Sequence, residues 1–555
     1  MTAATDAPSE LRTDVLVLGG GPAGTWAAVT AAAAGAAVVL ADKGYCGTSG
    51  AAASGGNNLW HVPPGPERAR AVARRAVAAG QLTDPGVSLR VLDETWRRVE
   101  QLADWGYPFP VDEHGVQRRS SLQGPEYLRR MRRKVLRSGV RVLDHHPALE
   151  LLVTPDGAVA GAAGIARQDG GAPWRVRAGA VVLATGGCAF LSGAFGLNVD
   201  TGDGHLMAAE VGAVLSGMEF SCAYALSPAF GNHTKGLMMQ FATYYGEDGR
   251  VIPADGLTGR VELARRAAAG ETIHAILDKA PEQLRPLARR AQPNYFLPLD
   301  KAGIDPFTQP YPLRFVLEGT VRGTGGLRLT GGDCATGTRG LYAAGDVASR
   351  EPVTGAISGG GSYNAAWAIS SGAWAGVAAA SYGRRHPAPR HVLPAGTAGL
   401  APAGTAGRHV GAPTGAVGRA GLGPAGTAAR DGLAAAGTAV GEVVAAVRAE
   451  VTPLSRNFFR TGAGLVDSLS RLDDIWSTAV AGIGGTGREA LRARQAAAMT
   501  AHARWMYRSA LARVESRGMH RRDDAPGSDP ALAHRILCGG LDEVWTAADR
   551  TAVAA

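Results

Sequence analysis

Residues 14–24 read DVLVLGGGPAG, a short apolar run that meets a glycine-rich turn. The apolar run predicts a buried strand, and the alanine-rich residues 25–37 that follow the turn predict a helix. Residues 38–43, VVLADK, predict a second buried strand. Strand, glycine turn, helix and strand in this order form a βαβ unit, so we expect an α/β protein.

The glycines of the turn have the spacing G-x-G-x-x-G. At a strand-to-helix turn the first glycine permits the tight turn, the second lets the backbone approach a pyrophosphate, and the third lets the helix pack on the strand. Asp42 ends the second strand about 20 residues later, where a carboxylate can bind ribose hydroxyls. The motif predicts a Rossmann-like dinucleotide-binding domain whose cofactor contacts include Gly19, Gly21, Pro22, Ala23, Gly24 and Asp42.

Two later strands indicate which dinucleotide is expected to bind. The Asp42 carboxylate would repel a 2′-phosphate, which leaves NAD or FAD. Residues 179–187, GAVVLATGG, and 340–346, GLYAAGD, each predict another strand followed by a glycine turn. An extended FAD needs such additional turns, whereas NAD does not. We therefore expect FAD, with further contacts from Thr185, Gly186, Gly345 and Asp346.

The chain of 555 residues is long enough for several domains. About 150 residues of mixed character separate the last two strands, which predicts an inserted domain. Residues 387–440 repeat Pro-Ala-Gly-Thr with few bulky apolar side chains, which predicts a disordered or loosely packed linker. The expected parts are a first FAD-binding segment (1–215), an inserted capping domain (216–335), a second FAD-binding segment (336–386), the linker (387–440) and a helical C-terminal module (441–555).

Composition argues against several other classes. The net charge of +9 comes without a basic block interleaved with aromatic residues, so we expect no nucleic-acid partner. The five cysteines are scattered without a C-x-x-C pair, which predicts neither a zinc site nor an iron–sulfur cluster. No apolar run is long enough to span a membrane, and the N-terminal residues do not resemble a signal peptide. We therefore expect a cytoplasmic protein without direct membrane insertion.

Six stretches together resemble the flavoprotein family of fumarate reductase, succinate dehydrogenase, L-aspartate oxidase and adenylylsulfate reductase. They occur in the family's order and span nearly the whole chain apart from the repetitive linker. The resemblance implies a Rossmann-like FAD-binding domain with an inserted α+β capping domain and a C-terminal helical module. The stretches are GGGPAG (19–24), TSGAAASGG (48–56), LATGG (183–187), TGDGHLMAAEVGAVLSGMEF (201–220), GLYAAGD (340–346) and ALARVESRGMHRRDDAP (510–526).

The resemblance also implies further FAD contacts. In this family the glycines after GLYAAGD pass beneath the flavin ring, and the helix from about residue 362 points its positive N-terminus at the ring's pyrimidine edge. Residues 48–56 lack the histidine that binds flavin covalently in some members, so we expect non-covalent FAD. The additional contacts expected are Lys43, Thr48, Ser49, Gly55, Gly56, Asp203, Ser362 and Tyr363.

The residues that bind dicarboxylates in this family are replaced here. The sequence MEFSCAYALSP (218–228) lacks the family's His-Pro-Thr element, and Ile357 and Ser358 stand where a substrate-binding arginine is expected. Binding two carboxylates without such groups leaves buried charges unpaired, so succinate or fumarate turnover is not expected. The loop GAISGGGSY (355–363) is more similar to the adenylylsulfate reductase branch, which works with a separate iron–sulfur protein.

Four side chains are candidates for catalysis. Arg322 stands where the family has a substrate-binding histidine and is the first candidate to hold substrate charge. Tyr245 replaces the arginine that serves as the family's acid and is a candidate proton donor. His61 follows a flavin-contacting stretch and could act as a base, and His233 lies in the inserted domain in GNHTKG. Each of the four has an alternative, purely structural reading.

The sequence thus predicts an FAD-dependent oxidoreductase that dehydrogenates or reduces a small polar substrate. We expect it to exchange electrons with a ferredoxin-like iron–sulfur protein, for which a basic surface is suited. Two alternatives remain open: an oxidase of a small amino acid or amine that uses dioxygen, as L-aspartate oxidase does, and a non-catalytic FAD-binding protein of a larger complex.

Overall fold

The computed structural model describes residues 9–112, 114–234, 237–254, 256–400 and 440–549. Its main sheet has β1 (Ser9–Leu18) between β2 (Val38–Ala41) and β8 (Ala172–Leu183), all parallel. β5 (Arg141–Leu143) continues the parallel part beyond β2, and β16 (Leu341–Ala343) pairs with the C-terminal end of β8. The βαβ unit is confirmed, and both later strands lie in the same sheet.

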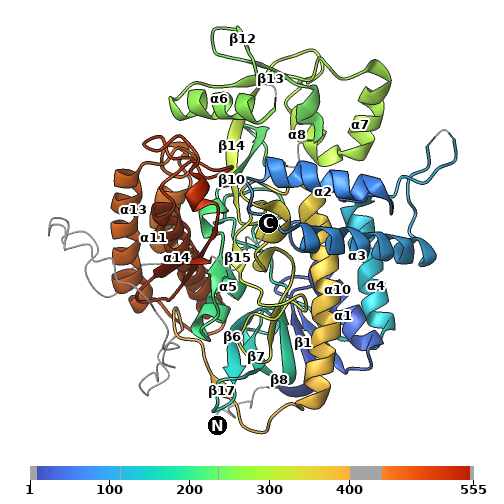
Figure 1. The fold of residues 1–555 in the computed structure, drawn as a ribbon, viewed down its shortest axis with the longest axis vertical. Coiled ribbons are helices and arrows are strands. Elements are labelled where there is room, and N and C mark those ends of the chain that lie inside the picture. The colour runs from blue at the N-terminus through green and yellow to red at the C-terminus, as the bar shows by residue number, and fades with distance from the viewer. Residues whose placement is uncertain (1–8, 113, 235–236, 255, 401–439, 550–555) are drawn as a thin grey trace.

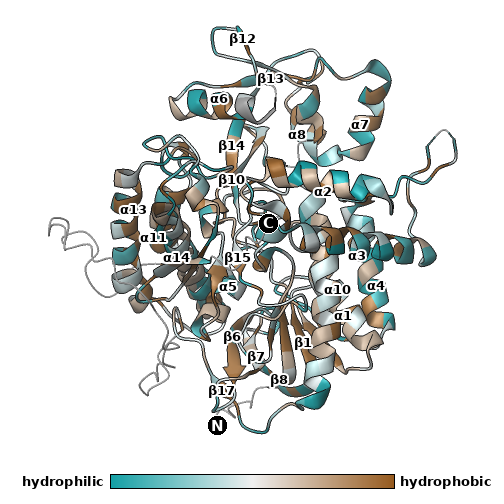
Figure 2. Ribbon diagram, viewed as in Figure 1, coloured by the Kyte–Doolittle hydropathy of each residue, from teal (hydrophilic) through white to brown (hydrophobic). Residues whose placement is uncertain are grey.

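Strand β1 is buried on both faces. Leu16 and Leu18 pack into one core, whereas Val15 and Val17 pack into another on the opposite side of the sheet. This double burial explains why the strand reads as an uninterrupted apolar run. Figure 2 shows the strands of the main sheet largely in hydrophobic colours, with polar residues on the outer faces of the surrounding helices.

The antiparallel edge of the sheet contains residues of the segment 387–440, which we expected from the sequence to be a linker. β6 (Ala148–Val153) and β7 (Val159–Ala166) extend the sheet from β8, and β17 (Leu393–Pro394) pairs with β6. The backbone amide of Gly396 donates to Glu150 at 3.2 Å, and that of Thr397 donates to Glu210 at 2.9 Å. Residues 387–400 are therefore anchored to the sheet, whereas 401–439 lie outside the described residues.

Helices cover the sheet on the right of Figure 1. α1 (Pro22–Ala33) packs against the long α10 (Ser362–Arg385), and a Cβ on Gly372 or Gly376 would lie 2.3 Å from a backbone oxygen of α1. The two helices can approach this closely because both positions are glycine. The remaining elements of this layer are α2 (Pro66–Ala78), α3 (Pro85–Asp104), α4 (Gly124–Arg137) and the strand pair β3 (Gly56–Asn58) and β4 (Ser121–Gln123).

A capping domain stands above this layer (Figure 1). Its five-stranded sheet has the order β10-β14-β13-β11-β12, and it has a separate core that includes Tyr295 and Tyr311. The sheet extends over 223–319, inside the expected 216–335. Its strands are β10 (Ala223–Pro228), β11 (Thr243–Tyr245), β12 (Val251–Ile252), β13 (His274–Ile276) and β14 (Tyr311–Gly319), and its helices are α6 (Gly256–Ala268), α7 (Arg285–Ala291) and α8 (Pro293–Lys301).

The C-terminal module is helical, as the sequence predicts, and it ends in a β-hairpin that the sequence did not predict. Its helices are α11 (Val440–Val451), α12 (Leu454–Asn457), α13 (Gly462–Asp474) and α14 (Arg488–Ala512). After α14 come β18 (Arg535–Gly539) and β19 (Trp545–Asp549), and β18 pairs with β9 (Leu215–Ser216), which in turn pairs with β15 (Gly326–Leu327). This shared four-stranded sheet joins the module to the rest of the chain. No helix in the described part of the chain is long and apolar enough to cross a membrane.

Candidate functional site

An elongated cavity lies at the carboxyl ends of the parallel strands. It encloses about 1400 Å³, including its open mouth. Its walls come from the turns that follow four strands of the main sheet, at Gly19–Ala23, Asp42–Gly44, Thr185–Gly186 and Gly345–Asp346. Ligands of α/β sheets bind at this edge, and we call the space the dinucleotide cavity.

The three motif glycines have different surroundings. Gly19 has φ +109°, and a Cβ there would lie 2.2 Å from the Ala184 carbonyl oxygen. A Cβ on Gly24 would lie 1.8 Å from the Gly19 carbonyl oxygen, so this glycine permits helix packing and does not line the cavity. A Cβ on Gly21 would meet no atom within 4 Å and would point into open space. Only Gly19 and Gly21 of the three therefore border the space available to a ligand.

Asp42 is held in place by three donors. Its carboxylate accepts hydrogen bonds from the Gly20 amide, the Gly44 amide at 2.7 Å and the Ser49 hydroxyl at 2.8 Å. The side chain is buried yet lines the cavity. A fixed carboxylate at this position suits recognition of ribose hydroxyls.

Lys43 and Asp203 form an ion pair in the cavity wall, with Nζ 2.6 Å from Oδ2. The Lys43 ammonium also donates to the Thr201 hydroxyl at 2.7 Å and to the Val199 carbonyl at 3.0 Å. Asp203 begins α5 (Asp203–Glu210), in the TGDG stretch. The pair links the turn after β2 to the start of α5, and both predicted residues line the cavity.

Buried polar atoms that lack hydrogen-bond partners in this cavity fit the binding of FAD. The Thr185 Oγ1, Asp200 Oδ2 and Asn364 Oδ1 atoms are buried without a hydrogen-bond partner among the described residues, and all three residues line the cavity. Buried polar atoms normally have partners, so these three are sites for a polar ligand. Burial, and next the Asp346 carboxylate, raise the pKa of Asp200 well above its usual value, so this carboxyl can donate a hydrogen bond.

Four further glycines line the dinucleotide cavity and leave free space beside their backbone. A Cβ on Gly50, Gly56, Gly360 or Gly361 would meet no atom within 4 Å. α10 begins directly after Gly361 without a side-chain cap, so its N-terminal amides are not satisfied by a capping side chain. This end can therefore accept the flat face of a ring together with its hydrogen-bond acceptors.

Some predicted contacts lie elsewhere. Tyr363 faces Arg75, whose guanidinium is 4.0 Å from the ring centroid, and does not line the cavity. Thr48 and Ser362 also do not line it, and Gly55 lines a second cavity described below. The glycines 360 and 361 carried a sequence signal in the GGGSY loop, whereas Asp200 and Asn57 carried none. Gly360 and Gly361 line the cavity. Lining residues that sequence reasoning missed include Gly20, Asn57, Asp200 and Asn364.

The second cavity, which we call the cap cavity, lies between the capping domain and the FAD-binding domain and encloses about 1570 Å³ with its mouth. Gly56, Arg322 and Gly361 line both cavities. The two spaces therefore meet at these residues. A molecule in the cap cavity can reach a cofactor in the dinucleotide cavity at this junction.

Arg322 is the charged side chain at the junction. Its Nε lies 3.2 Å from Oε2 of Glu318, whose other carboxylate oxygen accepts from the Thr234 hydroxyl at 2.6 Å. Glu318 lies near the end of β14 and is almost fully buried, so it orients the guanidinium from the protein side. The Arg322 side chain keeps 23% exposure toward the cavities.

The structure brings His233 to this site but not two of the other candidates. His233 lines the cap cavity, with the rings of Phe195 and Tyr295 each about 6.0 Å away. His61 stacks on Trp96 of α3 at 4.6 Å and lines neither cavity. Tyr245 lies in β11, which pairs with β12 and β13, and also lines neither cavity. These two placements favour structural roles for His61 and Tyr245.

The ionisable side chains that line the cap cavity are basic. Its described lining residues include Arg260, Arg290, Arg322 and His233, but no aspartate or glutamate. An anion is therefore the charge type that this space favours. Sequence reasoning missed Arg260 and Arg290, because single arginines carry no signal in an arginine-rich chain.

Family models match two parts of the sequence. An FAD binding domain matches residues 14–239, and a fumarate reductase flavoprotein C-terminal domain matches residues 455–544. The chain is 26% identical over 286 residues to a subunit of the CoM/CoB fumarate reductase of Methanothermobacter marburgensis, which covers 47% of this chain and 52% of that protein. The chain thus spans about half the length of the curated relative it matches.

Solved structures share the fold along nearly the whole chain. A quinol fumarate reductase of E. coli is 19% identical with a TM-score of 0.75, and the alignment covers 98% of both chains. Mycobacterium smegmatis Sdh1 is 20% identical with a TM-score of 0.76, over 98% of this chain and 96% of that one. Adenylylsulfate reductase from Archaeoglobus fulgidus is 17% identical with a TM-score of 0.72, over 98% and 96%. These similarities show the fold.

Proposed function

Because the chain belongs to the fumarate reductase and succinate dehydrogenase flavoprotein family of FAD-dependent oxidoreductases, we propose that it oxidises or reduces an organic anion in the cap cavity. When bound, FAD supplies two-electron hydride chemistry. The observation that carries the proposal is the position of Arg322, which lines both cavities and is oriented by Glu318. A fixed cation at this junction holds negative charge next to the place of reaction.

The placements of a histidine and a tyrosine refine the proton chemistry. His233 is buried in the cap cavity wall, where a histidine can take up or release the proton that accompanies a hydride. Tyr224 also lines this cavity, but its hydroxyl donates to the carbonyl oxygens of Val451 and Thr452. We therefore assign proton transfer to His233.

The proposed electron partner is a separate ferredoxin-like iron–sulfur protein. The five cysteines are buried, and within the described residues no cluster of three or more metal-ligating side chains is present. The net charge of +9 favours an acidic partner. A cytoplasmic location and non-covalent FAD remain part of the same proposal.

Anaerobic titration of the FAD-loaded protein tests the proposal. Reduced ferredoxin is expected to bleach the flavin absorbance, and a panel of unsaturated organic anions is then expected to restore it. Arg322→Gln should keep bleaching by ferredoxin but lose at least about tenfold in the rate of reoxidation by the anions. Arg339→Gln, which changes an exposed arginine paired with Asp156, serves as the control.

Two results of this titration would contradict the proposed function. Bleaching only by amino acids or amines, with peroxide released in air, would indicate an oxidase. A flavin that neither ferredoxin nor any small molecule bleaches would indicate a non-catalytic FAD-binding protein.

A further inference from the structure

The wall of the dinucleotide cavity has an excess of acidic side chains. Its described lining contains four aspartates but only two basic side chains, Lys43 and Arg322. FAD carries a diphosphate that is negatively charged at neutral pH. Carboxylates in this wall therefore repel the cofactor unless each is paired with a donor or protonated. The four aspartates are Asp42, Asp200, Asp203 and Asp346.

Three of these aspartates have partners that stabilise the charged form. Asp42 accepts hydrogen bonds from two backbone amides and a serine hydroxyl. Asp203 pairs with Lys43. Asp346 pairs with Arg350, which is itself fully buried. Such partners offset the cost of burying a charge, so these three side chains can remain carboxylates.

The fourth, Asp200, lacks a cationic partner. It is 4% exposed, and its Oδ2 atom is buried without a hydrogen-bond partner among the described residues. Lys43 donates to the Val199 carbonyl and the Thr201 hydroxyl on either side of it, and pairs with a different aspartate. No basic side chain in the described part of the chain forms an ion pair with Asp200. A buried carboxyl in this situation is most stable in its neutral form.

The backbone fixes Asp200 in the cavity wall. Its amide donates to the Leu197 carbonyl at 3.0 Å, and its carbonyl accepts from the Ala189 amide at 2.8 Å. A Cβ on Gly186 would lie 2.3 Å from Oδ1, so the carboxyl packs against the glycine turn that follows β8. The neighbouring Cys188 thiol is uncharged, because burial raises its pKa. The carboxyl thus remains beside the space that the cofactor occupies.

The charges that act on Asp200 also favour its neutral form. Burial, and next the Asp346 carboxylate, raise its pKa well above the usual value. Lys43 acts against this rise, whereas Asp203 and Asp42 add to it. A further negative charge in the cavity acts in the same direction as the three carboxylates.

We propose that Asp200 must be protonated for FAD to bind, so that cofactor binding and proton uptake are coupled at this residue. Where Asp200 is ionised in the apoprotein, its carboxylate takes up one proton from the solvent as FAD enters. Ionisation therefore competes with FAD, and affinity falls as the pH rises. Thr185 and Asn364, whose unpartnered atoms belong to the same wall, carry no charge and cannot produce this dependence. The inference concerns the cofactor and is independent of the substrate proposed above.

Flavin fluorescence quenching by the apoprotein measures Kd for FAD between pH 6 and pH 9. We expect the wild-type Kd to rise at least about tenfold over this range. Asp200→Asn keeps the shape and a neutral donor, so its Kd should lie within about threefold of the wild type at pH 6 and change by less than about twofold up to pH 9. The other titrating groups are the same in both proteins, so the comparison isolates Asp200. Asp156→Asn changes an exposed aspartate outside the cavity lining and should keep the wild-type pH dependence.

A proton count on the wild type does not depend on the folding of any variant. Calorimetric titration of the apoprotein with FAD, in buffers of different ionisation enthalpy, gives the number of protons taken up. At a pH where Kd is rising, we expect up to about one proton per FAD for the wild type and none for Asp200→Asn. The inference would be overturned by a wild-type Kd that is constant from pH 6 to pH 9, or by FAD binding without proton uptake. An Asp200→Asn protein that keeps the wild-type pH dependence, or that folds but binds FAD weakly at pH 6, would overturn it as well.

Discussion

At the scale of single residues, Arg350 links the wall of the dinucleotide cavity to the segment that carries Arg322. It is fully buried, and its guanidinium donates to the backbone carbonyls of Thr320, Val321 and Gly323 as well as to the Asp346 carboxylate. Asp346 lines the dinucleotide cavity, and residues 320–323 carry Arg322. Arg350 is therefore a positioning residue that ties the cofactor wall to the segment that presents Arg322.

Replacing Arg350 should be costly. Arg350→Gln leaves the Asp346 carboxylate and buried carbonyls without their charged donor, and losing one partner of a buried ion pair costs about 3–5 kcal/mol. Urea unfolding should show this loss of unfolding free energy, with Arg350→Lys intermediate. The exposed Arg339→Gln variant should change it by at most about 1 kcal/mol. A loss below about 1 kcal/mol for Arg350→Gln would contradict the assigned role.

Substitutions of two glycines in the turn are expected to have different effects on stability and on FAD binding. A Cβ on Gly24 would lie 1.8 Å from a backbone oxygen, so Gly24→Ala should destabilise the apoprotein by about 1–3 kcal/mol. A Cβ on Gly21 would enter open cavity space, so Gly21→Ala should leave apoprotein stability unchanged but weaken FAD binding at least about tenfold. Thermal melting and flavin fluorescence quenching measure the two effects. Equal phenotypes for the two variants would show that the glycines do not have separate roles.

At the scale of elements, α10 begins directly after two glycines that line the dinucleotide cavity. It has 24 residues, starts after Gly361 and has neither a capping side chain nor an acidic residue in its first turn. The positive end of its dipole is therefore uncompensated by its own first turn. Gly360 and Gly361 line the cavity directly before it, so this charge acts on whatever occupies that end.

A charge placed in the first turn should lower the flavin potential. Ser362→Asp offsets the dipole by about 0.3–1 kcal/mol, which is on the order of 6–20 mV for a two-electron couple. Ser362→Asn has the same shape without the charge and should leave the potential near the wild-type value. Anaerobic redox titration of both FAD-loaded variants measures the difference. A potential that rises in Ser362→Asp would contradict the expected direction.

The elements also show where sequence reasoning succeeds. The main sheet and the FAD turns could be predicted because glycines punctuate buried apolar strands, as at Gly19 and Gly345. The candidates His61 and Tyr245 could not be evaluated, because adjacency in sequence does not specify which way a side chain faces across a loop or cap strand. The hairpin β18–β19 was missed because its strand β18 pairs with β9, more than 300 residues earlier.

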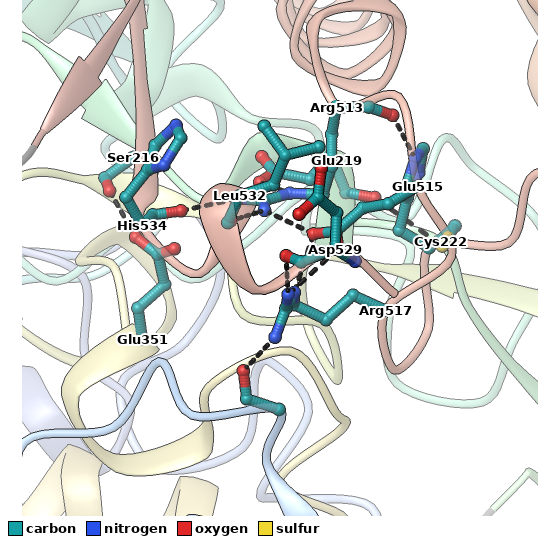
Figure 3. Close-up of polar contacts among 12 residues, drawn as sticks. Ser216, Glu219, Cys222, Glu351, Arg513, Glu515, Arg517, Asp529, Leu532 and His534 are labelled. Carbon is teal, nitrogen blue, oxygen red and sulfur yellow. Dashed lines mark hydrogen bonds and ion pairs between the residues drawn. The ribbon is translucent and has the colours of Figure 1, made fainter. Parts of the chain in front are cut away.

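At the scale of the whole molecule, a buried polar network fixes the C-terminal module to the FAD-binding domain (Figure 3). Arg513 is fully buried and pairs with Glu219 at 2.8 Å and Glu515 at 2.9 Å. Arg517 pairs with Glu515 at 2.6 Å and donates to the Gly80 carbonyl, while the His520 Nε2 donates to the Arg513 carbonyl at 3.0 Å. The ESRGMHR stretch (515–521) therefore has an architectural role.

Glu351 is a carboxylate of this interface whose charge state depends on pH near neutrality. It begins α9 (Glu351–Thr354), and its Oε2 accepts from the Ser216 hydroxyl of β9. Burial raises its pKa to about 7; Arg535 and Arg513 act against this rise, and Glu219 adds to it. The neutral carboxyl is therefore the form that the folded state favours.

The pH dependence of stability follows from the sign of this shift. Since folding raises the pKa of Glu351, its contribution to stability is fully present below about pH 4.5 and is lost as the pH rises through about 7. Glu351→Gln mimics the neutral form, so it should match the wild type near pH 4 and exceed it by about 3 kcal/mol near pH 8. Urea unfolding at both pH values measures the difference, with the exposed Glu442→Gln as control. If the wild type and Glu351→Gln differ by the same amount at both pH values, Glu351 does not titrate between them, and the C-terminal module is docked independently of its charge.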